Sequence, residues 1–165
     1  MTHLVIVEGI TDKGVVQEIA KKIKTPVEIL IMRGNNPNKA IRLIKAKLTV
    51  EKYNKVIVLK DLHQQPEDKI REKLNKIANS IDNTKVHGII VRKAIEAWIL
   101  AGIGETNPEN IDKPEELLDH IMRLKRRRYI KSLRTAKELT RNIDLQKAIK
   151  NSQTLRQLIE ILKDL

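Results

Sequence analysis

Apolar residues in the N-terminal part of the chain fall into short runs that alternate with segments of helical spacing. Four runs predict buried strands at 4–7, 27–32, 56–59 and 86–91. Apolar positions three and four apart predict helices at 14–23, 38–50, 66–81 and 94–101. This order predicts an α/β fold, with a mostly parallel central sheet of about four strands, right-handed crossovers and flanking helices.

The pattern changes after the last of these helices. Residues 102–114 are rich in Gly, Asn and Pro and predict a surface loop. Helical spacing then returns at 115–128, 130–141, 145–150 and 154–165. We therefore expect a core at 1–103 and a C-terminal helical extension at 104–165, packed together as one compact unit.

Acidic residues follow the first and third predicted strands. Glu8-Gly9 ends the first run, with Asp12 four positions after Glu8, and Asp61 and His63 follow the third run. The carboxyl ends of parallel strands share one edge, where open α/β sheets bind ligands. Glu8, Asp12, Asp61 and His63 are therefore candidate metal ligands. Simpler alternatives are that Glu8 only ends a strand and that Asp12 only caps the first helix.

These motifs resemble the Toprim domain, the metal-binding α/β module of topoisomerases, bacterial-type primases, OLD-family nucleases and a ribosomal RNA maturase. Glu8-Gly9 with Asp12 is similar to the family's glutamate-glycine turn. Asp61-Leu62-His63 is similar to its Asp-x-Asp motif, with His63 in place of the second aspartate. The resemblance implies a Toprim/Rossmann-like fold in which Glu8 and Asp61 are catalytic.

Further segments resemble the small stand-alone, OLD-like Toprim proteins. The stretch Glu96-Ala97-Trp98-Ile99-Leu100-Ala101 is similar to their Glu-x-Trp-Leu-Leu-Ala segment, and 129–131, 142–145 and 155–159 look like their C-terminal part. The resemblance thus covers nearly the whole chain. Glu96, an acid just after the fourth strand, is a candidate to complete the carboxylate cluster, and the alternative is that it faces water while Trp98 packs. Trp98 is expected in the core or as a cover over the site.

The residue types constrain the metal. The expected cofactor is a divalent ion, Mg²⁺ or Mn²⁺. The neutral imidazole of His63 suits Mn²⁺, Fe²⁺ or Zn²⁺ better than Mg²⁺. The sequence contains no cysteine, which excludes thiolate ligands and disulfides.

Basic residues outnumber acidic ones, 33 to 21, which gives a formal net charge of +12. That balance favours a nucleic acid partner over a membrane. The candidate phosphate-binding residues are the polar turn of Arg33 with Asn35-Asn36, and the densest basic cluster: Lys125, Arg126, Arg127, Arg128, Lys131 and Arg134. A solvated helix face is the simpler interpretation of this cluster. Aromatic residues make up only 2%, which weakens any model based on base stacking.

These observations favour a metal-dependent nuclease that cleaves DNA or RNA. The alternative is a non-catalytic nucleic-acid-binding Toprim module in DNA repair or RNA processing, which the histidine at position 63 favours. A nucleotide-binding enzyme lacks support because neither Gly-x-x-x-x-Gly-Lys nor Gly-x-Gly-x-x-Gly occurs. No leader and no apolar run near the roughly 20 residues of a membrane span is visible, so we expect a cytoplasmic location. DNA versus RNA and a homodimer versus a monomer stay open.

Overall fold

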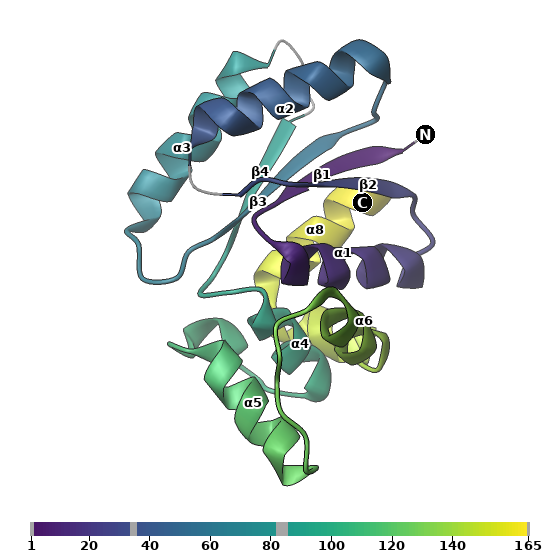
Figure 1. The fold of residues 1–165 in the computed structure, drawn as a ribbon, viewed down its shortest axis with the longest axis vertical. Coiled ribbons are helices and arrows are strands. Elements are labelled where there is room, and N and C mark those ends of the chain that lie inside the picture. The colour runs from purple at the N-terminus through teal and green to yellow at the C-terminus, as the bar shows by residue number, and fades with distance from the viewer. Residues whose placement is uncertain (1, 34–35, 82–85, 165) are drawn as a thin grey trace.

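A computed structural model of the chain describes residues 2–33, 36–81 and 86–164 (Figure 1). A four-stranded sheet lies at its centre, in the order β2-β1-β3-β4. All three neighbouring pairs are parallel, which confirms the α/β prediction. The strands are β1 (His3–Val7), β2 (Val27–Ile31), β3 (Val56–Asp61) and β4 (Val86–Val91).

Helices cover both faces of the sheet, and Figure 1 shows α2 and α3 on one face and α1 and α8 on the other. The helices are α1 (Ile10–Lys22), α2 (Pro37–Val50), α3 (Glu67–Ser80), α4 (Glu96–Ile103), α5 (Pro114–Leu124), α6 (Leu133–Arg141), α7 (Leu145–Asn151) and α8 (Gln153–Lys163), and a 3₁₀ turn lies at Pro108–Asn110. None of these helices is long and apolar enough to cross a bilayer.

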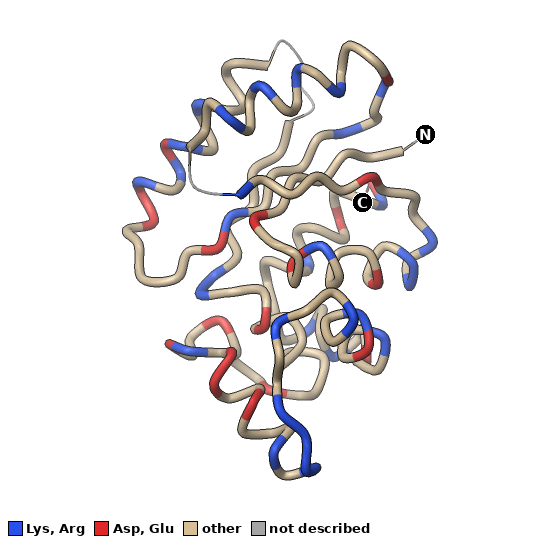
Figure 2. Tube along the Cα trace, in the orientation of Figure 1, with Lys and Arg blue, Asp and Glu red and all other residues tan. Residues whose placement is uncertain are grey.

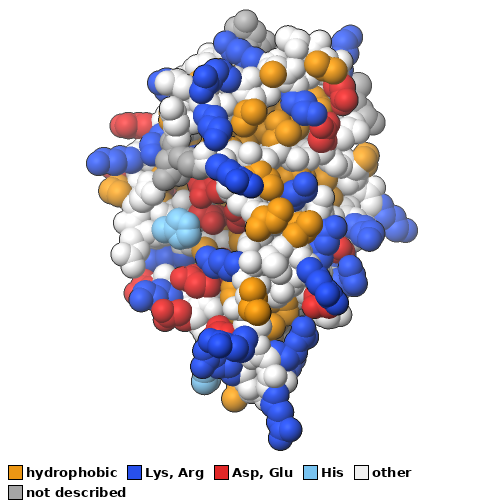
Figure 3. Space-filling model, viewed as in Figure 1, with side chains coloured by type: hydrophobic (Ala, Val, Ile, Leu, Met, Phe, Trp, Pro, Cys, Tyr) orange, Lys and Arg blue, Asp and Glu red, His pale blue; other side chains and the backbone are white. Residues whose placement is uncertain are grey.

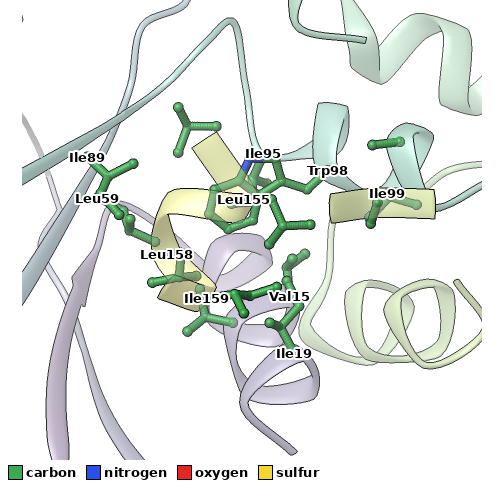
Figure 4. Close-up of a cluster of buried hydrophobic side chains, with 14 of the residues drawn as sticks. Val15, Ile19, Leu59, Ile89, Ile95, Trp98, Ile99, Leu155, Leu158 and Ile159 are labelled. Carbon is green, nitrogen blue, oxygen red and sulfur yellow. The ribbon is translucent and has the colours of Figure 1, made fainter. Parts of the chain in front are cut away.

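Alternate residues of the strands enter two different cores because successive strand side chains point to opposite faces. Leu4 and Ile6 of β1 pack with α2 and α3. Val5 and Val7 pack with α1, α4 and the C-terminal helices. The second core draws on the whole chain (Figure 4): its labelled residues are Val15, Ile19, Leu59, Ile89, Ile95, Trp98, Ile99, Leu155, Leu158 and Ile159. The C-terminal helices therefore complete the core of the sheet.

The strand order creates a crevice at one edge of the sheet. Strand β1 leads into α1 on one face, and its neighbour β3 leads into α3 on the opposite face. Chains that leave adjacent parallel strands in opposite directions open a gap at the carboxyl ends, the usual ligand site of open α/β sheets. Glu8 and Asp61 lie at this gap.

Two predicted helix boundaries are wrong in ways that matter for the site. Helix α1 begins at Ile10, so the N-cap is Gly9 and Asp12 is the third helical residue rather than the cap. Helix α5 ends at Leu124, so residues 125–128 lie in a loop rather than on a helix. Arg126 has φ 59°, and the amide of Arg127 donates to Met122 O at 2.9 Å, which closes the helix with a left-handed cap although no glycine marks it.

Other boundaries shift by a few residues. Helix α4 continues to Ile103, and the predicted loop at 102–114 contains the 3₁₀ turn, whose Pro108 is buried. Helix α6 begins at Leu133, later than predicted. Asn35 and Leu165, which belong to predicted segments, lie outside the described residues.

Candidate metal site at the carboxyl edge of the sheet

Three of the five predicted metal ligands converge on one point. Glu8, Asp61 and His63 each offer a ligand atom, and these atoms all lie within 4.8 Å of one another. Ligands on one divalent ion, at oxygen–metal distances of about 2.0 to 2.6 Å, are separated by at most about 4 to 5 Å. The spacing therefore suits a single shared ion.

Backbone hydrogen bonds beyond the end of β3 hold the histidine beside the aspartate. The amide of Leu62 donates to Val91 O at 2.9 Å, and the amide of His63 donates to Lys93 O at 2.8 Å. His63 takes a left-handed conformation, with φ 49°, which brings Nε2 to 3.7 Å from Asp61 Oδ2. The ladder between β3 and β4 thus fixes the ligand-bearing turn, while the His63 side chain remains 53% exposed.

Asp12 lines the same pocket but supports the turn between β1 and α1. Its Oδ2 accepts the Gly9 N–H at 2.9 Å, and the residue is 8% exposed. Burial raises the pKa of Asp12 to about 7; the hydrogen bond from Gly9 opposes this rise, and the nearby carboxylates of Glu8 and Glu96 reinforce it. Asp12 therefore titrates near neutral pH.

Glu96, the first residue of α4, is buried and does not face water. Its Oε2 accepts the hydroxyl of Tyr129 at 2.7 Å and lies 3.9 Å from Lys131 Nζ. Two residues on, Trp98 is completely buried in the core, and its Nε1 donates to Thr154 Oγ1 at 2.8 Å. The helix that carries Glu96 is thus anchored in the core and tied to the C-terminal part of the chain.

Lys60 is a residue of the site that the sequence analysis missed. It is completely buried, and its Nζ lies 3.4 Å from Glu8 Oε1. Burial lowers the pKa of Lys60, and the neighbouring Glu8 carboxylate raises it. The alternation of side chains along β3 indicates this position. Val56 and Val58 face the core beneath α2 and α3, so Lys60, two residues after Val58, points to the same side of the sheet.

The pocket concentrates negative charge that a cation would stabilise. Burial, followed by the neighbouring carboxyl groups of Asp12 and Glu8, raises the pKa of Asp61 well above its ordinary value. In Figure 3 the acidic side chains gather in a hollow beside a histidine, with lysine or arginine side chains above and below them. Two carboxylates and an imidazole form a mixed oxygen and nitrogen donor set, which fits Mn²⁺ better than Mg²⁺.

The predicted phosphate-binding residues do not form one surface. The segment between α5 and α6, residues 125–132, is here called the arginine loop. Figure 2 shows its basic tip at the end of the molecule remote from α2 and α3. Arg126, Arg127 and Arg128 line a shallow hollow there with Arg123, whereas Lys131, at the other end of the loop, lines the acidic pocket. Arg134 is exposed in the first turn of α6, and Arg33 is exposed after β2.

The arrangement can bind a divalent cation beside carboxyl groups whose pKa values are raised, with Lys131 at the same pocket. Comparison of the chain with protein-family models, with curated proteins and with solved structures found no match. The function of the site is therefore inferred from this chain's own residues and their positions.

Proposed function

We propose that this protein is a Toprim-type, divalent-metal-dependent nuclease that cleaves phosphodiester bonds in nucleic acid. The observation that carries the proposal is the convergence of Glu8, Asp61 and His63 within 4.8 Å at the crevice between β1 and β3. The order of these residues along the chain agrees with the Toprim resemblance. The donor set and the place in the fold therefore support the same chemistry.

Each residue of the pocket has a part in this reaction. Glu8, Asp61 and His63 would hold the ion, which when bound polarises a phosphate and lowers the pKa of water. In the alternative role that the resemblance suggests, Glu8 would not hold the ion but would accept the proton of the attacking water, because a general base must lie within hydrogen-bond reach of the reacting atom. Lys131 lines the pocket with a side chain that is 59% exposed, where a phosphate oxygen can reach its ammonium group.

A polyanionic substrate is supported by the net charge of +12 and by the arginine loop. Recognition would depend on phosphates rather than on stacked bases. The only tryptophan is completely buried, Tyr53 is 6% exposed, and the hydroxyl of Tyr129 is bonded to Glu96. These three are the only Phe, Tyr or Trp residues of the chain, so it offers no exposed platform of such rings for stacked bases.

The second candidate is a nucleic-acid-binding Toprim module without catalysis. It is favoured by His63, which stands where the resemblance implies an aspartate, and by Glu96, whose carboxylate already has Tyr129 and Lys131 as partners. Fewer free carboxylates then remain for magnesium. The two candidates differ in whether bound nucleic acid is cleaved.

Cleavage and binding assays on matched variants separate them. We expect the wild type to cleave DNA or RNA with Mn²⁺, and Glu8→Gln to lose at least about a hundredfold in rate while binding stays intact. Glu67→Gln, an exposed residue at the start of α3, is the matched control and should cleave normally. Salt-sensitive binding with no cleavage by the wild type would favour the binding module, and absence of binding would exclude both.

A further inference from the structure

Lys60 and Glu8 lie side by side just beyond the last pair of the β1–β3 ladder. The register pairs Leu4 with Val56 and Ile6 with Val58; Lys60 follows Val58 by two residues within β3, and Glu8 comes directly after the last residue of β1. Both side chains therefore belong to the same face of the sheet. The Lys60 ammonium is completely enclosed by protein, 3.4 Å from Glu8 Oε1.

An enclosed lysine is a fixed cation. Lysine is almost never fully buried unless it is paired, because an isolated charge in the protein interior is costly. Glu8, with a side chain that is 20% exposed, lies between this lysine and the group formed with Asp61 and His63. The Glu8 carboxylate thus contacts the Lys60 ammonium on one side and belongs to the candidate metal-binding group on the other.

Two-metal nucleases place their ions about 3.5 to 4 Å apart. A second ion at that spacing in this pocket would need Asp12 or Glu96 as a ligand, and each of them already uses one carboxylate oxygen in a hydrogen bond. Asp12 accepts the amide of Gly9, and Glu96 accepts the hydroxyl of Tyr129. Lys60 would also repel a second divalent ion, and the low effective dielectric of the interior strengthens that repulsion.

We propose that Lys60 takes the place of a second metal ion, so that the site binds one divalent ion, with Glu8 shared between this ion and the Lys60 ammonium. This inference rests on the proposed function and specifies the composition of its metal site. Lys60 is a positioning residue: it acts through Glu8 by occupying one of the two carboxylate oxygens.

Calorimetric titration with Mn²⁺, together with electron paramagnetic resonance, tests this on the full chain without any substrate. The wild type should bind one ion and show the spectrum of isolated Mn²⁺. Lys60→Met removes the charge at similar length, so we expect two ions, a spin-coupled pair, and at least about tenfold tighter binding of the first ion. Lys60→Arg, which restores the charge, should return the stoichiometry to one.

Lys131→Met is the matched control, because it also neutralises a lysine at the pocket but one that is largely exposed. It should leave the stoichiometry at one; two ions in this variant would mean that net charge, not the position of Lys60, sets the number. Two ions in the wild type, or one ion of unchanged affinity in folded Lys60→Met, would overturn the inference while keeping the metal site. No Mn²⁺ binding by the wild type would overturn the metal site itself. If Lys60→Met does not fold, Lys60→Gln provides the uncharged comparison.

Discussion

The acidic pocket and the arginine loop carry opposite charges in opposite surroundings. In the pocket, Asp12 and Glu96 are buried and each accepts a defined hydrogen bond. In the loop, Arg126, Arg127 and Arg128 are exposed at the tip of the molecule. Salt screens exposed charges, whereas burial shifts pKa values. The pocket should therefore respond mainly to pH and to metal, and the loop mainly to ionic strength.

The largest expected effect concerns the support beneath the pocket. Trp98→Ala removes the largest completely buried side chain, together with its hydrogen bond to Thr154. We expect a loss of about 3 to 5 kcal/mol of unfolding free energy, because a cavity remains in the core. Urea denaturation measures it. Trp98→Phe keeps a ring and loses the N–H, so it should cost clearly less; equal losses would mean that the hydrogen bond dominates.

The second largest expected effect is on the pH dependence of stability, which should differ between the pocket and the loop. The pKa of Asp12 is raised in the folded state, to about 7 from 3.8, so the folded protein holds a proton that the unfolded chain has lost. Stability from this group is therefore present at low pH and falls as pH rises from about 4 to 7, by on the order of 4 kcal/mol. Asp12→Asn keeps an acceptor for Gly9 and should flatten this decline in a series of thermal unfolding curves.

Asp119, which anchors the arginine loop, is the control with the opposite sign. Its pKa is lowered, first by the hydrogen bond from the Tyr129 amide, so its contribution to stability is lost as pH falls through the folded pKa. Asp119→Asn should therefore remove stability near neutral pH and little in acid. Identical pH profiles for the two variants would contradict the contrast between pocket and loop.

The smallest expected effect on stability belongs to the loop. Replacing Arg126, Arg127 and Arg128 with alanine should change the unfolding free energy by less than about 0.5 kcal/mol per residue, since all three are exposed. Nucleic acid binding should weaken, and its salt slope should fall by up to about 0.9 for each duplex phosphate that the protein no longer neutralises. A filter-binding salt titration measures this. An unchanged slope would remove the loop from the binding surface.

The strands and the meeting of Glu8 with Asp61 could be predicted from the sequence because each depends on local pattern. A buried parallel strand has a continuous apolar run, and acids that follow two such runs share one edge of the sheet. No long-range information was needed. The same period of two places Lys60, the residue after Leu59, on the inward face with Val56 and Val58.

The remaining features depend on partners that are distant along the chain. Glu96 is buried because Tyr129, 33 positions later, provides a hydroxyl. The end of α5 depends on a left-handed Arg126, a conformation that the sequence usually marks with glycine. A run of basic residues has helical propensity, so local pattern predicted that the helix would continue through it.

The left-handed conformation of residue 63 also bears on how this site could change during evolution. Histidine, asparagine and aspartate are the non-glycine residues most tolerated at positive φ. The bond from the residue 63 amide to Lys93 O involves only the backbone, so it would survive such a substitution. An aspartate at this position would convert the segment after β3 into the Asp-x-Asp form with no change of fold. The same backbone could thus present either a mixed nitrogen and oxygen donor set, which suits Mn²⁺, or an all-oxygen set, which suits Mg²⁺.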